Sequence, residues 1–161
     1  MMKDVIDELR KFADDITEWY PPAKRKDIEE FEQSLDVKLP DDYKEFLMET
    51  NGFQMMGQDI FGIKNRQFDL YEAYRIEHNE VYVKMPHHLI PICPDGYGNH
   101  YCFDNSNDNV VVFWEFDLAA YYQDRQEVYE PEVVYPDFKS MVQELLIDWT
   151  LEDYNYDGSE K

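Results

Sequence analysis

The sequence is short of basic residues. It holds 15 Lys and Arg against 36 Asp and Glu, which gives a formal net charge of −21. Because nucleic-acid affinity depends largely on Lys and Arg that neutralise phosphates, we expect no nucleic-acid partner. The imbalance is greatest in residues 85–161, with 16 acids and 3 bases. Such a surface attracts basic proteins, although plain solubility explains the charge equally well.

Long hydrophobic runs are also absent. No apolar stretch approaches the ~20 residues that span a bilayer. The first twelve residues, MMKDVIDELRKF, lack the apolar core of a secretion signal. We therefore expect no membrane partner and a cytoplasmic location. In that compartment Cys93 and Cys102 stay reduced.

Glycine is scarce, with 6 residues in the chain. The sequence has no G-x-S-x-G nucleophile motif, no P-loop and no G-x-G-x-x-G dinucleotide motif. The pair Gly96 and Gly98, which follows Asp95, is typical of a turn. We therefore predict no catalytic residue and no cofactor.

A histidine and a cysteine suggest a metal site that the spacing does not support. In an extended strand His100, Cys102 and Asp104 share one face. Structural zinc requires four ligands, usually with short Cys or Cys/His pairings, whereas eight residues separate Cys93 and Cys102. We predict a hairpin here and no metal, and an enzyme or metal protein built on residues 92–108 is the third-ranked alternative.

The same part of the sequence also shows the spacing of a calcium-binding loop. Asp104, Ser106, Asp108 and Glu115 fall at positions 1, 3, 5 and 12 of an EF-hand loop. However, Asn109 stands where the sharp turn of that loop needs glycine, and predicted strands replace the flanking helices. We attribute the match to chance.

The first half of the chain predicts three helices and a hairpin. Apolar spacing favours helices over 3–18 and 24–35, and Asp36 follows the second where a left-handed residue is expected. A third helix begins at Pro40, and Asn51-Gly52 stops it. The runs FQMM and DIFGI flank Gly57 and predict a hairpin. Residues 69–83 fit either a helix or a strand.

The second half predicts strands followed by a helix. HLIPIC, NHYCF and VVVFWEF are typical of three strands, and residues 117–135 are predicted to form a long acidic loop. A last helix opens at Pro136-Asp137, with Phe138, Met141, Val142, Leu145 and Trp149 facing inward, and 152–161 is an acidic, frayed tail. The predicted fold is one α+β domain, 1–161: an antiparallel sheet of about four to six strands flanked by N-terminal helices and a C-terminal helix.

Two blocks of the sequence are similar to a known family. DIEEFEQSLDVKLPDDYKEFLMETNGF (27–53), and LIPICPDGYGNHYCFD followed by VVFWEFD, resemble the two signature blocks of the SUKH superfamily (Smi1/Knr4-like). Together they span about residues 24–118. The family usually has glycine where Asp36 stands, and an Asp-His-Glu-like run where this chain has residues 114–117. The second departure leaves the subfamily open.

The resemblance implies an α+β fold and a role in protein binding. Many bacterial members look like immunity proteins that bind and block a cognate toxin domain, often a nuclease, and fungal relatives act as interaction proteins in cell-wall signalling. The family is not known for catalysis. The leading hypothesis is an immunity protein that occludes a basic toxin with acidic and aromatic side chains, and the alternative is a regulatory interaction module. The sequence leaves the oligomeric state open.

The candidate partner-binding residues combine acidic and tyrosine side chains. Tyrosine is enriched in binding surfaces, although a solvated loop is an equally good reading of residues 117–135. Asp104 either braces the turn after it or faces a partner, and Glu115 points outward. The full set is Asp104, Glu115, Tyr121, Tyr122, Asp124, Glu127, Tyr129, Glu130 and Glu132.

Overall fold

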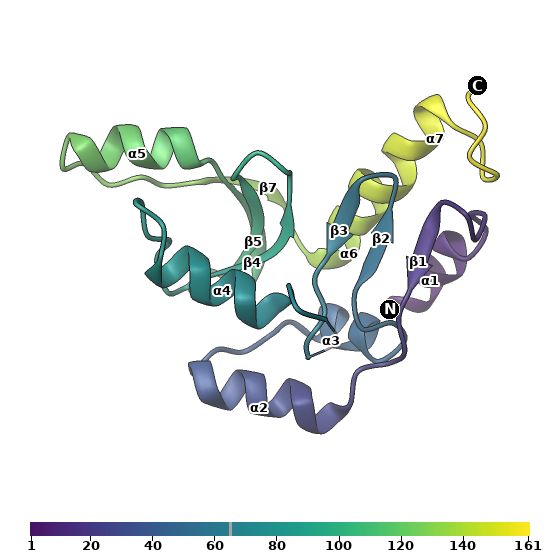
Figure 1. The fold of residues 1–161 in the computed structure, drawn as a ribbon, viewed down its shortest axis with the longest axis horizontal. Helices are drawn as coiled ribbons and strands as arrows, with labels where there is room; N and C mark the ends of the chain where they lie inside the picture. Colours follow the sequence, from purple (N-terminus) through teal and green to yellow (C-terminus); the bar gives the residue numbers. More distant parts are fainter. Residues whose placement is uncertain (65) are drawn as a thin grey trace.

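The computed structural model describes residues 1–64 and 66–161 (Figure 1). Its first half forms a three-stranded antiparallel sheet, β1-β2-β3, with three helices. The bounds are α1 Lys3–Leu9, β1 Thr17–Trp19, α2 Arg25–Leu35, α3 Asp41–Leu47, β2 Phe53–Met55 and β3 Gln58–Ile60. The predicted hairpin around Gly57 is confirmed, because Phe53 pairs with Ile60 across β2 and β3.

The second half forms a four-stranded antiparallel sheet in the order β4-β5-β6-β7. Its elements are α4 Leu70–Asn79, β4 Leu89–Pro94, β5 His100–Asp104, β6 Val110–Trp114, α5 Phe116–Asp124, β7 Glu132–Tyr135, α6 Phe138–Met141, the π-helix η1 Val142–Asp148 and α7 Trp149–Asp153. The predicted α+β class is confirmed, with the strands divided between two sheets.

The local signals in α2 and in the β4–β5 turn behave as expected, whereas α3 is shorter than predicted. Asp36 adopts a left-handed conformation at the end of α2, with φ of 50°. Pro40 is the residue before α3 rather than its first residue, and α3 ends at Leu47, before Asn51-Gly52. Between β4 and β5, Asp95 Oδ1 accepts hydrogen bonds from the backbone N–H groups of Tyr97 (2.8 Å) and Asn99 (3.1 Å). The predicted hairpin is therefore built by an aspartate-braced turn.

The four-stranded sheet buries both of its faces. Alternate residues point to opposite sides of a strand, so Phe103 and Val111 join the main core whereas Cys102 and Val112 join a second, smaller cluster. The second cluster is covered by residues 83–85 and by Ala119 of α5. This covering places α5 on the outer side of the sheet, away from both termini (Figure 1).

One predicted helix needs correction, and one open alternative is resolved. The first helix ends at Leu9, and Thr17–Trp19 is a strand that pairs with β2, so the predicted helix over 3–18 is too long. Residues 70–79 are helical, and the side chain of Asp69 caps this helix by accepting the backbone N–H of Glu72 at 3.0 Å. Of the helix and the strand left open for residues 69–83, residues 70–79 form the helix, and this cap stabilises its first turn.

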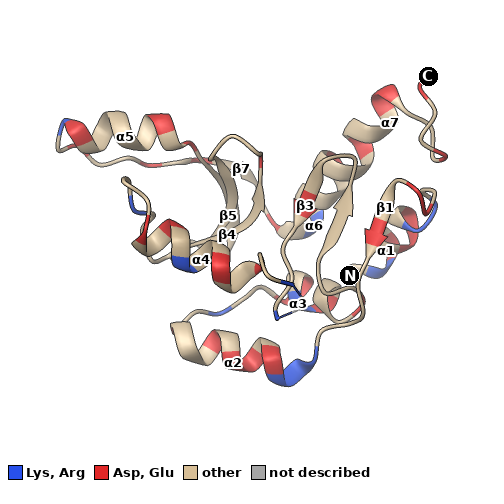
Figure 2. Cartoon of the chain, viewed as in Figure 1, with Lys and Arg blue, Asp and Glu red and all other residues tan. Residues whose placement is uncertain are grey.

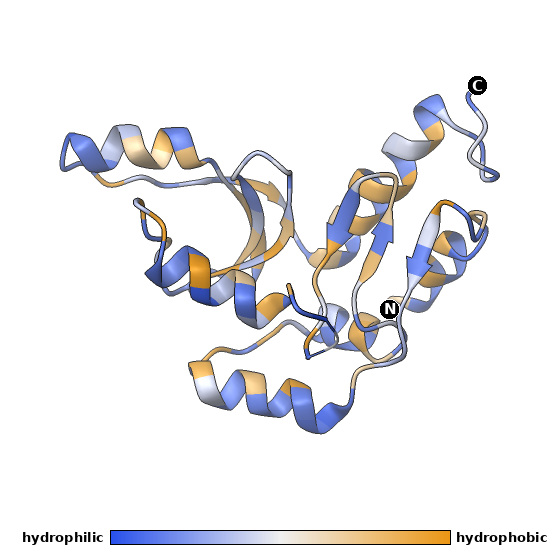
Figure 3. Cartoon of the chain, viewed as in Figure 1, coloured by the Kyte–Doolittle hydropathy of each residue, from blue (hydrophilic) through white to orange (hydrophobic). Residues whose placement is uncertain are grey.

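The long acidic loop predicted for residues 117–135 is wrong. Residues 116–124 form α5, and 132–135 form the edge strand β7, in which Val133 pairs with Val112. Only Ala119 of α5 is buried, so the helix has no wide apolar stripe that would reveal it in the sequence. Figure 3 shows hydrophobic residues in the first half of α5 and hydrophilic residues at its end.

The C-terminal segment also differs from expectation. The helix that opens at Asp137 passes into a π-helix, whose wider turns change which residues face inward. Leu146 and Ile147 are buried, whereas Trp149 is 46% exposed. Residues 152–161 fold back on the segment that follows α1: the backbone N–H of Ala13 donates to the carbonyl of Tyr156 at 2.8 Å. Because Tyr156 also packs on Phe12, the acidic tail is not frayed.

Candidate partner-binding surface

A strongly acidic surface segment runs from Glu115 to Glu132, and we call it the α5 face. It comprises α5 and the extended segment that leads to β7, and the two run side by side (Figure 1). Residues 115–132 hold six acids and one base, Arg125. Figure 2 shows red acidic residues along this segment and one blue basic residue at the end of α5.

A depression of about 390 Å³ lies in the α5 face. Its lining brings together residues from the start of α5 and from the segment before β7. The lining residues are Glu115, Leu118, Tyr122, Val128, Tyr129, Glu130 and Glu132. Five of the nine predicted partner-binding residues therefore meet in one place.

Aromatic packing holds the wall of this depression. The rings of Tyr122 and Tyr129 stack with centroids 5.7 Å apart, and Trp114 packs against Tyr129 at 5.1 Å. The Tyr129 hydroxyl accepts a hydrogen bond of 3.1 Å from the backbone N–H of Glu115. Burial raises the pKa of Tyr129, so the phenol stays neutral at physiological pH.

Three predicted residues lie next to the depression. The guanidinium carbon of Arg125 lies 3.5 Å from the ring centroid of Tyr121. Asp124 Oδ1 accepts a hydrogen bond of 2.9 Å from the hydroxyl of Tyr82, which joins the end of α5 to the loop after α4. Glu127 lines a neighbouring depression of about 340 Å³, which Trp114 also borders.

The carboxylates of the α5 face are not neutralised by the chain itself. Within residues 1–64 and 66–161, no Lys, Arg or His lies within ion-pair distance of Glu115, Glu127, Glu130 or Glu132. The contrast is clear on α4, where Arg75 pairs with both Glu72 and Glu80. The α5 face is therefore a source of uncompensated negative potential.

Apolar side chains are exposed on the same face. Leu118 is 41% exposed, Tyr121 49% and Val128 82%. Sequence reasoning missed Leu118 and Val128 because it treated this segment as a loop. Leu118, Tyr121 and Tyr122 do fall at i, i+3 and i+4, but this short pattern is too narrow to identify α5, and Val128 lies after the helix.

Asp104 lies apart from the α5 face, at the opposite end of β5 from His100. Its Oδ1 accepts hydrogen bonds from Ser106 N (3.0 Å) and Ser106 Oγ (2.6 Å). Of the two roles predicted for Asp104, the structure shows that it braces the turn between β5 and β6.

In the cluster of residues 92–108, the side chains of Cys93, His100 and Cys102 are buried. His100 Nε2 lies 3.5 Å from Glu77 Oε1, and Cys102 Sγ lies 3.9 Å from Met85 Sδ. Burial raises the pKa of Cys93 to about 12 and also raises the pKa of Cys102 well above its usual value. The thiolate is the nucleophile and the metal ligand, and both of these thiols stay protonated at neutral pH. Among the described residues, no three His, Cys, Asp or Glu side chains are grouped to hold a metal ion.

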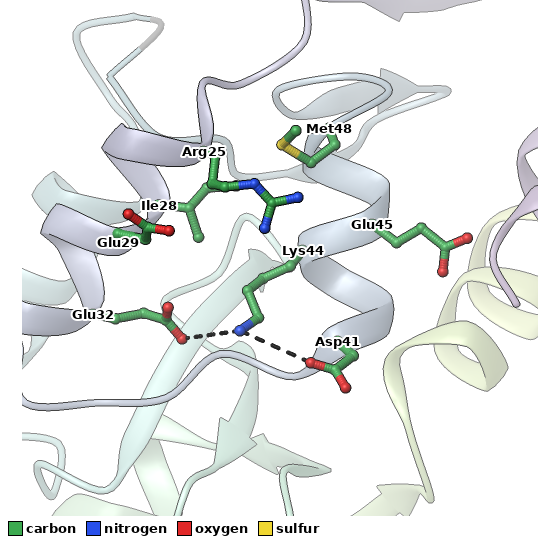
Figure 4. A pocket seen from close by; sticks show the side chains of 8 residues that line it. All are labelled: Arg25, Ile28, Glu29, Glu32, Asp41, Lys44, Glu45 and Met48. Atoms are coloured by element: carbon green, nitrogen blue, oxygen red, sulfur yellow. Dashed lines mark hydrogen bonds and ion pairs between the residues drawn. The ribbon is translucent and has the colours of Figure 1, made fainter.

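A second hollow, of about 470 Å³, separates α2 from α3 (Figure 4). Here the chain neutralises part of its own charge: Lys44 Nζ lies 3.4 Å from Glu32 Oε2 and 3.9 Å from Asp41 Oδ1. Glu45 points away from the other labelled side chains. This hollow thus has mixed, partly paired charges, unlike the α5 face.

None of the helices in the described part of the chain is long and apolar enough to cross a membrane.

Comparison with known proteins identifies relatives in sequence and in fold. The family model described as SMI1/KNR4 family (SUKH-1) matches residues 22–144. YnaB of Bacillus subtilis, an uncharacterized protein, is 39% identical over 61 residues. That match covers 37% of this chain and 36% of YnaB, so the chain spans about a third of that relative's length.

A solved structure supports the fold. A protein from Pseudomonas syringae pv. tomato superimposes with a TM-score of 0.65 over 89% of this chain and 96% of that one. The two sequences are 20% identical, so the likeness concerns the fold alone.

Proposed function

The chain belongs to the SMI1/KNR4 family (SUKH-1), and from that premise we propose that it is an immunity protein that binds and neutralises a cognate toxin domain. The family blocks noted in the sequence support the role. The observation that carries the proposal is the α5 face, where uncompensated carboxylates surround exposed aromatic and apolar side chains.

The proposed partner is a basic nuclease domain. A nuclease needs positive charge around its active site to hold phosphates, and an acidic inhibitor is attracted to that charge. In the proposed mechanism Glu115, Glu130 and Glu132 take the place of phosphates. Tyr121, Tyr122 and Tyr129 exclude water around them and anchor the interface. The toxin is blocked by occlusion, with no chemical step.

Co-expression tests this role. The protein is expressed together with the toxin domain encoded beside its gene, and cell growth and complex formation are measured. The triple variant Glu115→Gln, Glu130→Gln and Glu132→Gln removes three charges from the α5 face. The control Asp14→Asn, Asp15→Asn and Glu29→Gln removes three exposed charges elsewhere.

We expect growth rescue by the wild type and by the control, and loss of rescue by the α5 triple variant. Binding should weaken as salt rises, because screening reduces attraction between exposed charges. If the protein neither binds nor neutralises a neighbouring toxin, the immunity role is wrong and a regulatory interaction module becomes the better description.

A further inference from the structure

The depression in the α5 face has the chemistry of a site for one cationic side chain. We infer that it seats the guanidinium group of an arginine presented by the protein partner. This inference rests on the proposed function, which supplies a basic protein partner. It goes further by naming the chemical group of that partner that the depression binds. Nucleic acids and anionic lipid surfaces are repelled by the same carboxylates.

The shape of the depression suits a single long side chain. Its volume of about 390 Å³ lies at the low end of the ~300–1,000 Å³ range of small-ligand sites. Leu118 and Val128 supply apolar surface for the aliphatic stem of an arginine. Glu115, Glu130 and Glu132 lie around the same hollow and supply carboxylates for the charged end.

The electrostatics favour a cation. Three carboxylates line one hollow, and among the described residues none of them has a basic partner. Carboxylates that line one hollow repel one another, and a guanidinium placed between them relieves the repulsion. Its planar fork of N–H donors matches carboxylate oxygens in a bidentate manner, which an ammonium group does not do.

The aromatic wall selects arginine in a second way. Guanidinium groups stack on aromatic rings more often than lysine ammonium groups do. The chain already contains one such contact on this face: Arg125 lies over the ring of Tyr121, and its Nη1 donates to the carbonyl of Tyr121 at 3.0 Å. The next residue, Tyr122, lines the depression.

A small probe tests the inference without the toxin. The full ¹⁵N-labelled protein is titrated with N-acetyl-arginine amide, and amide chemical shifts are followed by NMR. N-acetyl-citrulline amide, which keeps the shape of arginine without its charge, is the first control. N-acetyl-lysine amide, which keeps the charge without the planar fork, is the second.

We expect saturable shifts at Tyr122, Val128, Tyr129 and Glu130 with the arginine probe, none with citrulline, and weaker binding of lysine. The double variant Glu130→Gln and Glu132→Gln should weaken arginine binding about threefold to tenfold, given the worth of partly exposed ion pairs. The matched control Asp14→Asn and Asp15→Asn should bind within about twofold of the wild type, because those two residues lie outside the depression.

Shifts spread over the acidic surface, or equal losses in the two double variants, would overturn the inference. Its outcome is separable from that of the proposed function. If arginine maps to the depression but no neighbouring toxin is neutralised, the site stands and the immunity role fails. If the toxin is neutralised but the probe does not map to the depression, the immunity role stands and the arginine site is wrong.

Discussion

The hydroxyl oxygen of Tyr129 accepts a hydrogen bond of 3.1 Å from the backbone N–H of Glu115. This bond links the residue before α5 to the segment that follows the helix, and both residues line the same depression. The shape of the α5 face therefore depends on a contact between two residues that are 14 positions apart.

Replacing Tyr129 with phenylalanine should loosen this part of the molecule. The change leaves the N–H of Glu115 without its acceptor, and a lost hydrogen bond of this kind costs about 0.5–1.5 kcal/mol. Urea unfolding measures the stability, and hydrogen exchange of the Glu115 amide reports the local effect. Tyr121→Phe, on an exposed ring, is the control. Unchanged exchange at Glu115 would show that the bond does not hold the segment.

A buried phenol in α3 should matter much more than an exposed one in a turn. The hydroxyl of Tyr43 donates to the carbonyl of Phe61 at 2.5 Å, and Tyr43 is fully buried. Tyr43→Phe leaves that carbonyl unpaired and should cost about 1–3 kcal/mol of unfolding free energy. Tyr97→Phe, at a residue 88% exposed, should be neutral. Equal stability of the two variants in urea would contradict this assignment.

The π-helix reverses which of two side chains, Leu146 or Trp149, should matter more for stability. Leu146 is fully buried, whereas Trp149, which α-helical spacing places inward, is 46% exposed. Leu146→Ala should therefore cost about 2–5 kcal/mol. Trp149→Ala should cost about 1 kcal/mol or less. Urea unfolding measures the stability of the two variants. A larger loss of unfolding free energy for Trp149→Ala would mean that this segment keeps ordinary α-helical spacing.

The two cysteines should be protected in the folded protein. Both are buried, and burial raises the pKa of both thiols. We expect Ellman's reagent to react slowly with the native wild type at pH 8 and rapidly once the protein is unfolded in urea. Asn107→Cys, in the exposed turn after β5, should add one fast-reacting thiol. Fast reaction of native wild type would show that Cys93 or Cys102 is accessible.

Stability should fall at alkaline pH. The pKa of Cys93 rises from 9.0 to about 12 in the folded chain. Above pH 9 the unfolded thiol loses its proton while the folded one keeps it, so the native state binds more protons and stability decreases as pH rises. The contribution approaches about 1.4 kcal/mol per pH unit. Burial likewise raises the pKa of Tyr135 to about 12, with the same sign.

The slope of stability against pH separates the contribution of the Cys93 thiol from that of other groups. Cys93→Ala should lose stability less steeply than the wild type between pH 9 and pH 11, whatever its starting stability. Urea midpoints measured at several pH values provide the comparison. Parallel slopes would assign the alkaline loss to Cys102 and to the tyrosines.

The sequence was sufficient to predict the structure of segments whose conformation is set by residues close together in the chain. The apolar stripe of α2, the left-handed Asp36 and the turn braced by Asp95 each depend on neighbours within a few residues, and each was predicted. The candidate site was predicted only in part. Its acids and tyrosines were named from composition, but their gathering around one depression was not, and Asp104 lies elsewhere.

The sequence by itself determined the α+β class, the paired strands, the negative charge and the family likeness, because each follows from residue type and short-range spacing. Tertiary structure alone decided that 116–124 is a helix, that Trp149 turns outward and that the tail packs on Phe12. Those outcomes rest on contacts between residues far apart in the chain, such as Val133 with Val112 and Ala13 with Tyr156. Their free energy exceeds the weak local preferences of the same segments.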